Sequence, residues 1–419
     1  DWHLNQGRLN FEQFGSAGTG NITIWGTQDY NRLESLIRMD GGNQTVTMLG
    51  LYADPTSMLA ARYSFGTIFV KDQARIYVEP PADDRTIQIS NLSFDSSDTT
   101  GLVPARVRFE TPRQRQMVVA GTTFLTGGNT ALDLYWTNGG GSVEGINKAS
   151  GVGSGLSIEK LDNGNVSTRG LLKWGNAMLF VRGDSSATFN GPVTIDTGAI
   201  QVNHNGSLGI GPITVNRFGV LDINAAGWSS TNPAPTYNEG SAERWSIDGA
   251  RNGQTVQLGK ATLQINSDQF TATGVTVNLN GGGVEGWLRA DDLLDGTSGV
   301  IFRTIGSGVG FQLDGDSFVG LNFSESYSGL DAGRLPSYQG FNDINARGVF
   351  LEILGGFTGT GRLTKRGLDT VTLSGAMTHT GGTHVTMGAL RLGATNVLPA
   401  TGPLSTANSG VLDLNGFAQ

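Results

Sequence analysis

Residues 363–392 include three short segments, Leu363-Thr-Lys-Arg-Gly367, Val371-Thr-Leu-Ser-Gly375 and Gly388-Ala-Leu-Arg-Leu392. Apolar and polar residues alternate within the segments, and each segment has a glycine at one end. Alternation with a period of two predicts a β-strand that buries one face and exposes the other. The glycines interrupt each strand after a few residues, so this part of the chain is predicted to consist of many very short strands.

A second copy of the pattern lies about 190 residues earlier, which is typical of stacked, repetitive architectures. Leu171-Leu-Lys-Trp-Gly175 corresponds to the segment at Leu363, and Gly198-Ala-Ile-Gln-Val202 to the segment at Gly388. Gly219-Val-Leu-Asp-Ile-Asn224 corresponds to Gly410-Val-Leu-Asp-Leu-Asn415. We expect Asn224 and Asn415, at matching places, to take left-handed turn conformations and to bond the adjacent coil.

These residues resemble the autotransporter-associated β-strand repeat, in which Leu-Thr-Lys-x-Gly precedes glycine-bounded strands and a Gly-x-Leu-Asp-Leu-Asn-Gly segment. The match covers Leu363–Gln419 and, more loosely, Leu171–Asn224. It departs at Ala376-Met-Thr-His379, where the family has Asn and Tyr. The resemblance implies an all-β fold, a right-handed parallel β-helix (β-solenoid), in a protein exported to the bacterial cell surface or beyond.

The composition agrees with an exported, turn-rich β protein. Gly accounts for 64 of 419 residues, and 15% of the residues are charged, against about a quarter in ordinary domains. There are no cysteines, so neither disulfides nor a cysteine metal site contributes. The net charge of -8 disfavours nucleic acid as a partner, and no apolar run is long enough for a transmembrane segment. Because the chain begins with Asp1 and ends inside a repeat, we expect it to be a piece of a longer precursor.

The breaks between predicted strands and the positions of the two repeats divide the chain into five predicted regions. Residues 1–50 form an N-terminal cap region, 51–170 the first coils, and 171–224 the first recognisable repeat. Residues 225–350 add coils with long protruding loops, at 225–255 and 322–345, and 351–419 form the C-terminal repeat, which is truncated. The strand spacing in 51–135 also fits a β-sandwich, and the downstream repeat favours the β-helix.

One segment has helical rather than strand periodicity. Asp29–Met39 places Leu33, Leu36 and Ile37 on one face, which predicts a short amphipathic helix. A helix here would cover the exposed strand edge of the first coil. The alternative is a helical turn inside a loop.

Three aromatic residues are candidates for carbohydrate or surface contact. Trp228, Tyr237 and Trp245 lie in the predicted loop at 225–255, and aromatic faces suit sugar rings. Packing of the loop against the coils is the alternative interpretation.

Metal and cofactor motifs are weak. Asp314 and Asp316, and Asp291 and Asp292 with Asp295, offer oxygens for calcium, but turn-forming aspartates are the simpler interpretation. His379 and His384 lack a nearby cysteine or carboxylate partner.

Gly281–Gly286 formally matches a dinucleotide fingerprint without its downstream acidic residue, so a turn between coils is favoured. Arg106 and Arg108, like Arg113 and Arg115, would share a strand face, which is the pattern of a basic stripe in nucleic-acid readers. The acidity of the chain favours a solvated face instead. No cofactor and no catalytic residue is predicted.

Two function classes follow. The first is a structural or adhesive rod that binds surfaces or polysaccharide ligands, or assembles with other copies end to end into fibres through unpaired strand edges. The second is a polysaccharide lyase or hydrolase built on the same scaffold, with the clustered acids as its site. The fold does not choose between them, and the first is preferred because no catalytic constellation is evident.

Overall fold

The structure is a computed structural model that describes residues 2–4, 7–11, 22–25, 35–39, 60–62, 67–71, 75–78, 86–95, 105–110, 116–137, 155–175, 178–228, 234–286, 301–320, 349–367 and 369–419. All regular elements of these residues are β-strands, which confirms the all-β prediction. Among them there is accordingly no helix with the length and apolarity needed to span a membrane.

The chain divides into two compact units, Asp1–Thr214 with Thr231–Pro233, and Val215–Ser230 with Ala234–Gln419. In the first unit, one sheet contains β1 (Trp2–Leu4), β3 (Ile22–Trp25), β5 (Ala60–Arg62), β6 (Thr67–Lys71), β8 (Thr86–Ile89), β9 (Asn91–Asp95), β11 (Gln116–Leu125), β13 (Gly155–Asp162), β15 (Met178–Val181) and β17 (Gly198–Val202). A second sheet contains β2 (Gly7–Phe11), β4 (Ser35–Met39), β7 (Arg75–Val78), β10 (Ala105–Glu110), β12 (Thr130–Thr137), β14 (Leu171–Trp174) and β16 (Val193–Ile195). β18 (Ile213–Val215) lies at the boundary between the units.

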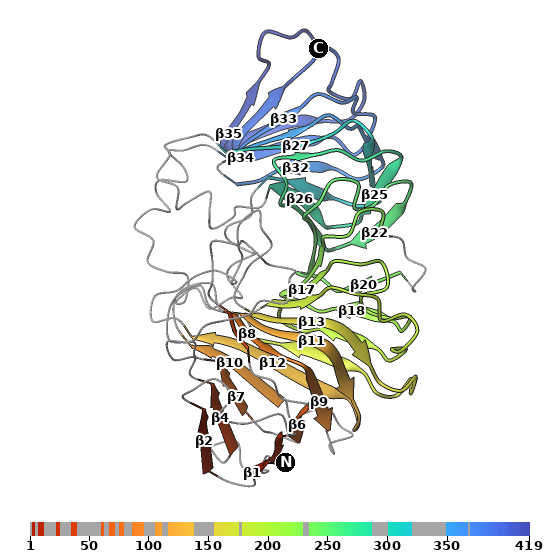
Figure 1. Cartoon of the computed structure of the whole chain (residues 1–419). Coiled ribbons are helices and arrows are strands. Elements are labelled where there is room, and N and C mark those ends of the chain that lie inside the picture. Colours follow the sequence, from red (N-terminus) through yellow and green to blue (C-terminus); the bar gives the residue numbers. More distant parts are fainter. Residues whose placement is uncertain are drawn as a thin grey trace. The chain divides into compact units, whose positions relative to one another are not determined.

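The second unit has the same organisation. Its larger sheet contains β19 (Gly219–Ile223), β21 (Ala242–Trp245), β23 (Thr262–Ile265), β24 (Gln269–Phe270), β26 (Gly283–Gly286), β27 (Ile301–Ile305), β29 (Ser317–Val319), β30 (Val349–Ile353), β32 (Leu363–Lys365), β33 (Thr370–Leu373), β34 (Thr383–Leu392) and β35 (Leu404–Asp413). A smaller sheet contains β22 (Thr255–Gly259), β25 (Val275–Leu279), β28 (Val309–Leu313) and β31 (Phe357–Gly359), and β20 (Thr236–Tyr237) follows β18 in its sheet. Figure 1 shows the strands of each unit stacked side by side.

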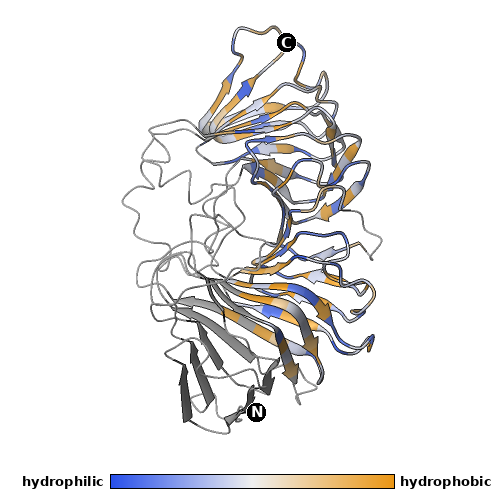
Figure 2. Ribbon diagram, viewed as in Figure 1, coloured by the Kyte–Doolittle hydropathy of each residue, from blue (hydrophilic) through white to orange (hydrophobic). Residues whose placement is uncertain are grey.

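The strands pair in parallel, one coil upon the next, and this register builds the core. In the first unit, Leu156, Leu179 and Ile200 pair in one column across β13, β15 and β17, and all three are fully buried. In the second unit, Leu351, Val371 and Leu390 form an equivalent buried column. Apolar and polar residues alternate along the strands (Figure 2). Burying each such side chain contributes about 1.5–3 kcal/mol, so the apolar columns are the main source of stability.

Parallel pairing decides between the two β architectures that the spacing allows. β6 pairs with β9, and β8 with β11, in parallel, whereas the sheets of a sandwich are antiparallel. Stacked sheets of parallel strands joined by turns are consistent with a β-helix or solenoid.

Two local predictions are wrong. Ser35–Met39 does not form a helix but forms β4, which pairs with β2 on one side and β7 on the other. The two parallel ladders give its backbone hydrogen-bond partners on both sides, and this outweighs the helical spacing of its apolar residues. Residues 29–34 lie outside the described part. The expected irregular loop at 225–255 contains β21, an interior strand of the larger sheet.

The two asparagines at matching repeat positions differ. Asn415 has a φ of 50°, and its side-chain amide donates to the carbonyl of Leu392 in the preceding coil at 3.2 Å, as predicted. Asn224 does not have a positive φ, so the left-handed turn predicted there is wrong. The predicted loop at 322–345 lies outside the described residues.

Candidate functional site

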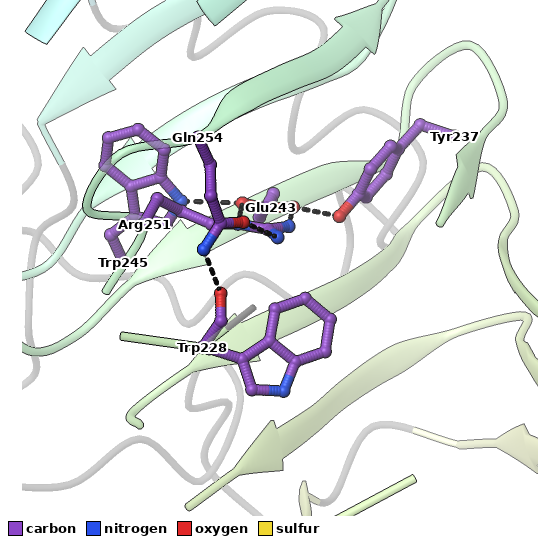
Figure 3. Close-up of polar contacts among 6 residues, drawn as sticks. All are labelled: Trp228, Tyr237, Glu243, Trp245, Arg251 and Gln254. Carbon is purple, nitrogen blue, oxygen red and sulfur yellow. Dashed lines mark hydrogen bonds and ion pairs between the residues drawn. The ribbon is translucent and has the colours of Figure 1, made fainter. Parts of the chain in front are cut away.

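Two of the three aromatic candidates belong to the interior of the second unit rather than to its surface. The side chains of Trp228 and Trp245 are 0% exposed, and Tyr237 is half-buried. Both indoles are therefore packed inside the protein, as in the alternative interpretation, and a sugar ring does not reach them. Figure 3 shows that Tyr237 and Trp245 both reach one acidic side chain, that of Glu243, and that Trp228 is joined to the same group through Gln254.

Glu243 comes from the middle of β21. Its register partners are Leu221 and Leu263, so its side chain lies on the same side of the sheet as these two apolar residues. Its carboxylate is 0% exposed. It accepts hydrogen bonds from Trp245 Nε1 at 2.6 Å, from Arg251 Nε at 2.9 Å and Nη2 at 2.5 Å, and from the hydroxyl of Tyr237. A buried carboxylate needs such partners, since an isolated buried charge is very costly.

Arg251 completes the cluster. Its guanidinium lies over the ring of Trp228, 4.5 Å from the ring centroid, and its Nη1 donates to Gln254 Oε1 at 3.2 Å. Gln254 in turn donates to the main-chain carbonyl of Trp228 at 2.6 Å, which holds the indole beneath the guanidinium (Figure 3). Arg251 therefore joins the carboxylate of Glu243 to a cation–π contact.

The pKa values of the cluster reflect burial and charge. Burial, together with the negative charge of Glu243, raises the pKa of the Tyr237 hydroxyl well above its usual value. Burial alone would lower the pKa of Arg251, but the charge of Glu243 outweighs it and the pKa is raised. Tyr237 thus stays protonated and donates to Glu243, and the arrangement is a closed ion-pair network that braces the core.

A second polar row lies on the opposite side of the same strands. Asp222, Arg244, Gln264 and Glu285 are register partners across β19, β21, β23 and β26, and all are buried. Arg244 Nη2 donates to Gln264 Oε1 at 3.0 Å, and Gln264 Nε2 donates to Glu285 Oε1 at 2.9 Å. Acidic, basic and amide groups alternate along this row, so neighbouring side chains compensate one another.

Both copies of the repeat bury the lysine of their Leu-x-Lys-x-Gly segment. Lys173 and Lys365 are each 0% exposed. Lys173 Nζ donates to the carbonyls of Trp174 at 2.8 Å, Gly175 at 2.8 Å and Thr197 at 3.1 Å. Lys365 Nζ donates to those of Arg366 at 2.6 Å, Gly367 at 2.9 Å and Met387 at 3.2 Å, and to Asp369 Oδ1 at 3.0 Å. We call this arrangement the lysine clamp.

Two glycines make the clamp possible. The second residue after each lysine has a positive φ, 81° at Gly175 and 73° at Gly367, which turns consecutive carbonyls toward Nζ. The third carbonyl precedes Gly198 in one copy and Gly388 in the other, and both also have positive φ. Burial lowers the pKa of Lys365, and the negative charge of Asp369 partly opposes that shift.

The solvent-facing side of the second unit carries a row of mainly apolar residues that is exposed at its two ends and half-buried between them. Phe302, Phe350, Thr370, Ala389 and Val411 are register partners across β27, β30, β33, β34 and β35. Phe302 is 60% and Val411 55% exposed, and the rings of Phe302 and Phe350 stack with centroids 5.3 Å apart. We call this row the Phe302 face. A partly exposed apolar row of this kind is typical of an interaction surface.

A pattern in the sequence indicates the Phe302 face. It was not recognised among the predicted contact residues, which were tryptophans and a tyrosine. Ile301-Phe-Arg-Thr-Ile305 and Val349-Phe-Leu-Glu-Ile353 both place phenylalanine second in a five-residue strand, directly before a buried residue, Arg303 or Leu351. Beside the row, the Arg391–Asp413 ion pair at 2.8 Å gives the face a polar margin.

The candidate metal residues do not converge. Asp314 and Asp316 are exposed, and Asp316 is paired with Arg362 at 2.9 Å, while residues 291–295 lie outside the described part. His379 is buried with Nε2 3.1 Å from Thr383 Oγ1, whereas His384 bonds Ser405 Oγ at 2.7 Å. Within the described ranges, no group of three or more His, Asp or Glu side chains is placed to hold a metal ion.

The remaining motifs also belong to strands and turns. Gly283–Gly286 forms β26, and Gly281 has a φ of 96°, as a turn between coils requires. Arg106 and Arg108 lie two apart on β10, where their register partners on β12 are Asp133 and Tyr135. Arg113 and Arg115 lie outside the described residues.

Comparison with known proteins gives one distant relative. No protein-family profile matches the chain, and no solved structure matches it. The chain is 24% identical over 363 residues to the adhesin BmaC autotransporter of Brucella suis biovar 1 (strain 1330). The match covers 79% of this chain and 9% of that protein. The chain is thus similar, at low identity, to a small segment of an autotransporter adhesin.

Proposed function

We propose that this chain is a segment of an exported bacterial cell-surface adhesin, built as a right-handed parallel β-helix that presents its outer face to a target. The observation that carries the proposal is the similarity of most of the chain to an autotransporter adhesin. The right hand of the coil follows from the general preference of parallel crossover connections.

The structure supports an adhesive role in two ways. Stacked parallel coils with buried apolar columns make a scaffold whose side chains hold fixed positions on its surface. The Phe302 face then offers two exposed apolar side chains, Phe302 and Val411, at the ends of a half-buried row on regular strands, with the polar Arg391–Asp413 pair beside it. Apolar anchors with a polar margin are the composition of protein-binding surfaces, so we propose that this face contacts a protein on the target cell.

An attachment assay tests the proposal. The chain, displayed on a non-adherent bacterium, is expected to increase attachment to epithelial monolayers, and the purified chain should block that attachment in solution. Phe302→Ser should reduce attachment at least several-fold. Ile210→Ser is the matched control, because Ile210 is also an exposed apolar residue, at 51%, but lies outside the Phe302 face. Attachment that is unchanged by display of the chain would contradict the adhesive function, and equal loss in both variants would contradict the assigned face.

The same material addresses the second function class. Incubation of the purified chain with acidic polysaccharides should release no new reducing or unsaturated ends, and their release would favour the lyase or hydrolase instead. Assembly of copies end to end stays a prediction, for which electron micrographs showing ordered filaments are the expected outcome.

A further inference from the structure

One turn of the first unit combines a reactive dipeptide with a neighbouring base. His204-Asn205-Gly206 follows β17, and both His204 and Asn205 are exposed. The main-chain N–H of Gly206 donates to His204 Nδ1 at 3.1 Å. Asparagine followed by glycine is the dipeptide most open to attack on the side-chain amide by the next main-chain nitrogen, because glycine has no side chain to hinder it.

The turn is held in place around this contact. His204 N donates to Ser207 Oγ at 3.0 Å, and that hydroxyl donates to the carbonyl of Val181 at 2.9 Å. The carbonyl of Gly206 accepts from Ser185 N at 2.9 Å. The imidazole and the Gly206 nitrogen therefore stay within hydrogen-bond distance, as a general base requires.

The other asparagine–glycine steps among the described residues lack this combination. The side chains of Asn163, Asn190, Asn252 and Asn415 are engaged in hydrogen bonds. Asn280 is exposed like Asn205, but the N–H of Gly281 donates to the hydroxyl of Ser317 at 3.3 Å, and a hydroxyl is not a base at neutral pH. Asn280 is thus a natural control that differs in the acceptor beside the glycine nitrogen.

We propose that Asn205 is a site of self-catalysed deamidation in which His204 acts as the base. Gly206 N bonds to Asn205 Cγ while His204 Nδ1 takes the proton from that nitrogen. The Cγ–Nδ2 bond then breaks, and Nδ2 leaves as ammonia with a proton returned by the imidazole. Water opens the resulting succinimide ring at either carbonyl, which leaves aspartate or isoaspartate at position 205.

The modification changes the charge of an exposed turn that already carries an acid. Asp184 packs against Gly206, so that a Cβ built on the glycine would lie 1.9 Å from Asp184 Oδ1. Hydrogen bonds from Ser186 lower the pKa of Asp184, which is therefore ionised at neutral pH. Deamidation adds a second carboxylate to this turn, and the added negative charge is irreversible.

Peptide mapping by mass spectrometry tests the proposal in the folded chain. During incubation at neutral pH, the peptide containing Asn205 is expected to convert to the acid form roughly tenfold faster than that containing Asn280, a modest effect for a positioned base. His204→Gln should bring the two rates together. Circular dichroism should show that this exposed substitution leaves the fold unchanged.

A denatured sample separates structure from local sequence. In concentrated urea the two rates are expected to converge, because the hydrogen bond from Gly206 to His204 is lost. Equal rates in the folded chain, an unchanged rate at Asn205 in His204→Gln, or a ratio that persists in urea would each overturn the proposal.

Discussion

The lysine clamps and the Glu243 cluster both bury an ion completely, yet they compensate its charge by different means. Lys173 and Lys365 are held by main-chain carbonyls, two of which belong to the next two residues of the same chain segment. Glu243 is held by the side chains of Tyr237, Trp245 and Arg251. A clamp made of main chain recurs wherever the glycines recur, whereas a cluster made of side chains requires a particular set of residues.

The two sites therefore depend on the sequence in different ways. The clamp depends on a lysine and on glycines at fixed spacing, so copying the segment copies the site. The cluster instead depends on particular side chains within residues 228–254. Removing charges from each site should therefore have distinct consequences.

Arg251→Met is expected to have the largest effect. It leaves the Glu243 carboxylate buried without its cation, which should lower the free energy of unfolding by about 3–5 kcal/mol. Urea denaturation followed by tryptophan fluorescence measures this, since two tryptophans line the cluster. Adding Glu243→Gln should restore part of the stability. A loss below about 1 kcal/mol would show that the pair does not brace the core.

Lys365→Met should come next, with a loss of about 3 kcal/mol, because three carbonyls and the buried Asp369 carboxylate lose their donor. Lys260→Met serves as the control and should have no measurable effect, since the side chain of Lys260 is 61% exposed. The midpoint of urea unfolding is the measurement. Equal behaviour of the two variants would argue against the clamp as a stabilising element.

Gly198→Ala tests the backbone half of the clamp. Its Cβ would lie 2.3 Å from the carbonyl oxygen of Gly175 and 3.0 Å from Lys173 Nζ, at a φ of 70°. We expect a loss of about 2 kcal/mol, of which the left-handed conformation accounts for about 1. Gly253→Ala measures the conformational contribution alone. Gly253 also has a φ of 70°, but no atom lies within 4 Å of a Cβ added there. Thermal unfolding of the two variants should differ, and identical midpoints would exclude the steric contribution.

Tyr237→Phe should have the smallest effect and one that depends on pH. The folded chain keeps the hydroxyl protonated well above pH 10.0, whereas the unfolded chain ionises near that pH. The contribution of Tyr237 is therefore complete below pH 10 and declines above it, by up to about 1.4 kcal/mol per pH unit. Unfolding free energies at pH 9 and 11 should fall less in the variant than in the parent chain. Parallel pH profiles would be the contrary result.

Local patterns predicted the strands and some of the repeat chemistry but not the burial of charges. Val371 and Leu373 alternate with threonine, and their strand and its inward face followed directly. In Ala242–Trp245, by contrast, two charged residues argued against an interior strand. Glu243 and Arg244 are nevertheless buried there, because their hydrogen-bond partners lie on other segments. Phe302 was missed for a similar reason, since only register shows that it stacks on Phe350.

The all-β class, the short glycine-bounded strands and the repeated copy at Leu171 and Leu363 could be predicted from local patterns, because they depend on residues near one another in the chain. Three further features became evident in the folded chain: Ser35–Met39 is a strand, Trp228 and Trp245 are interior, and Glu243 pairs with Arg251. Those outcomes depend on which coils become neighbours, and the free energy of burying a charge or a ring is set by the groups it meets there.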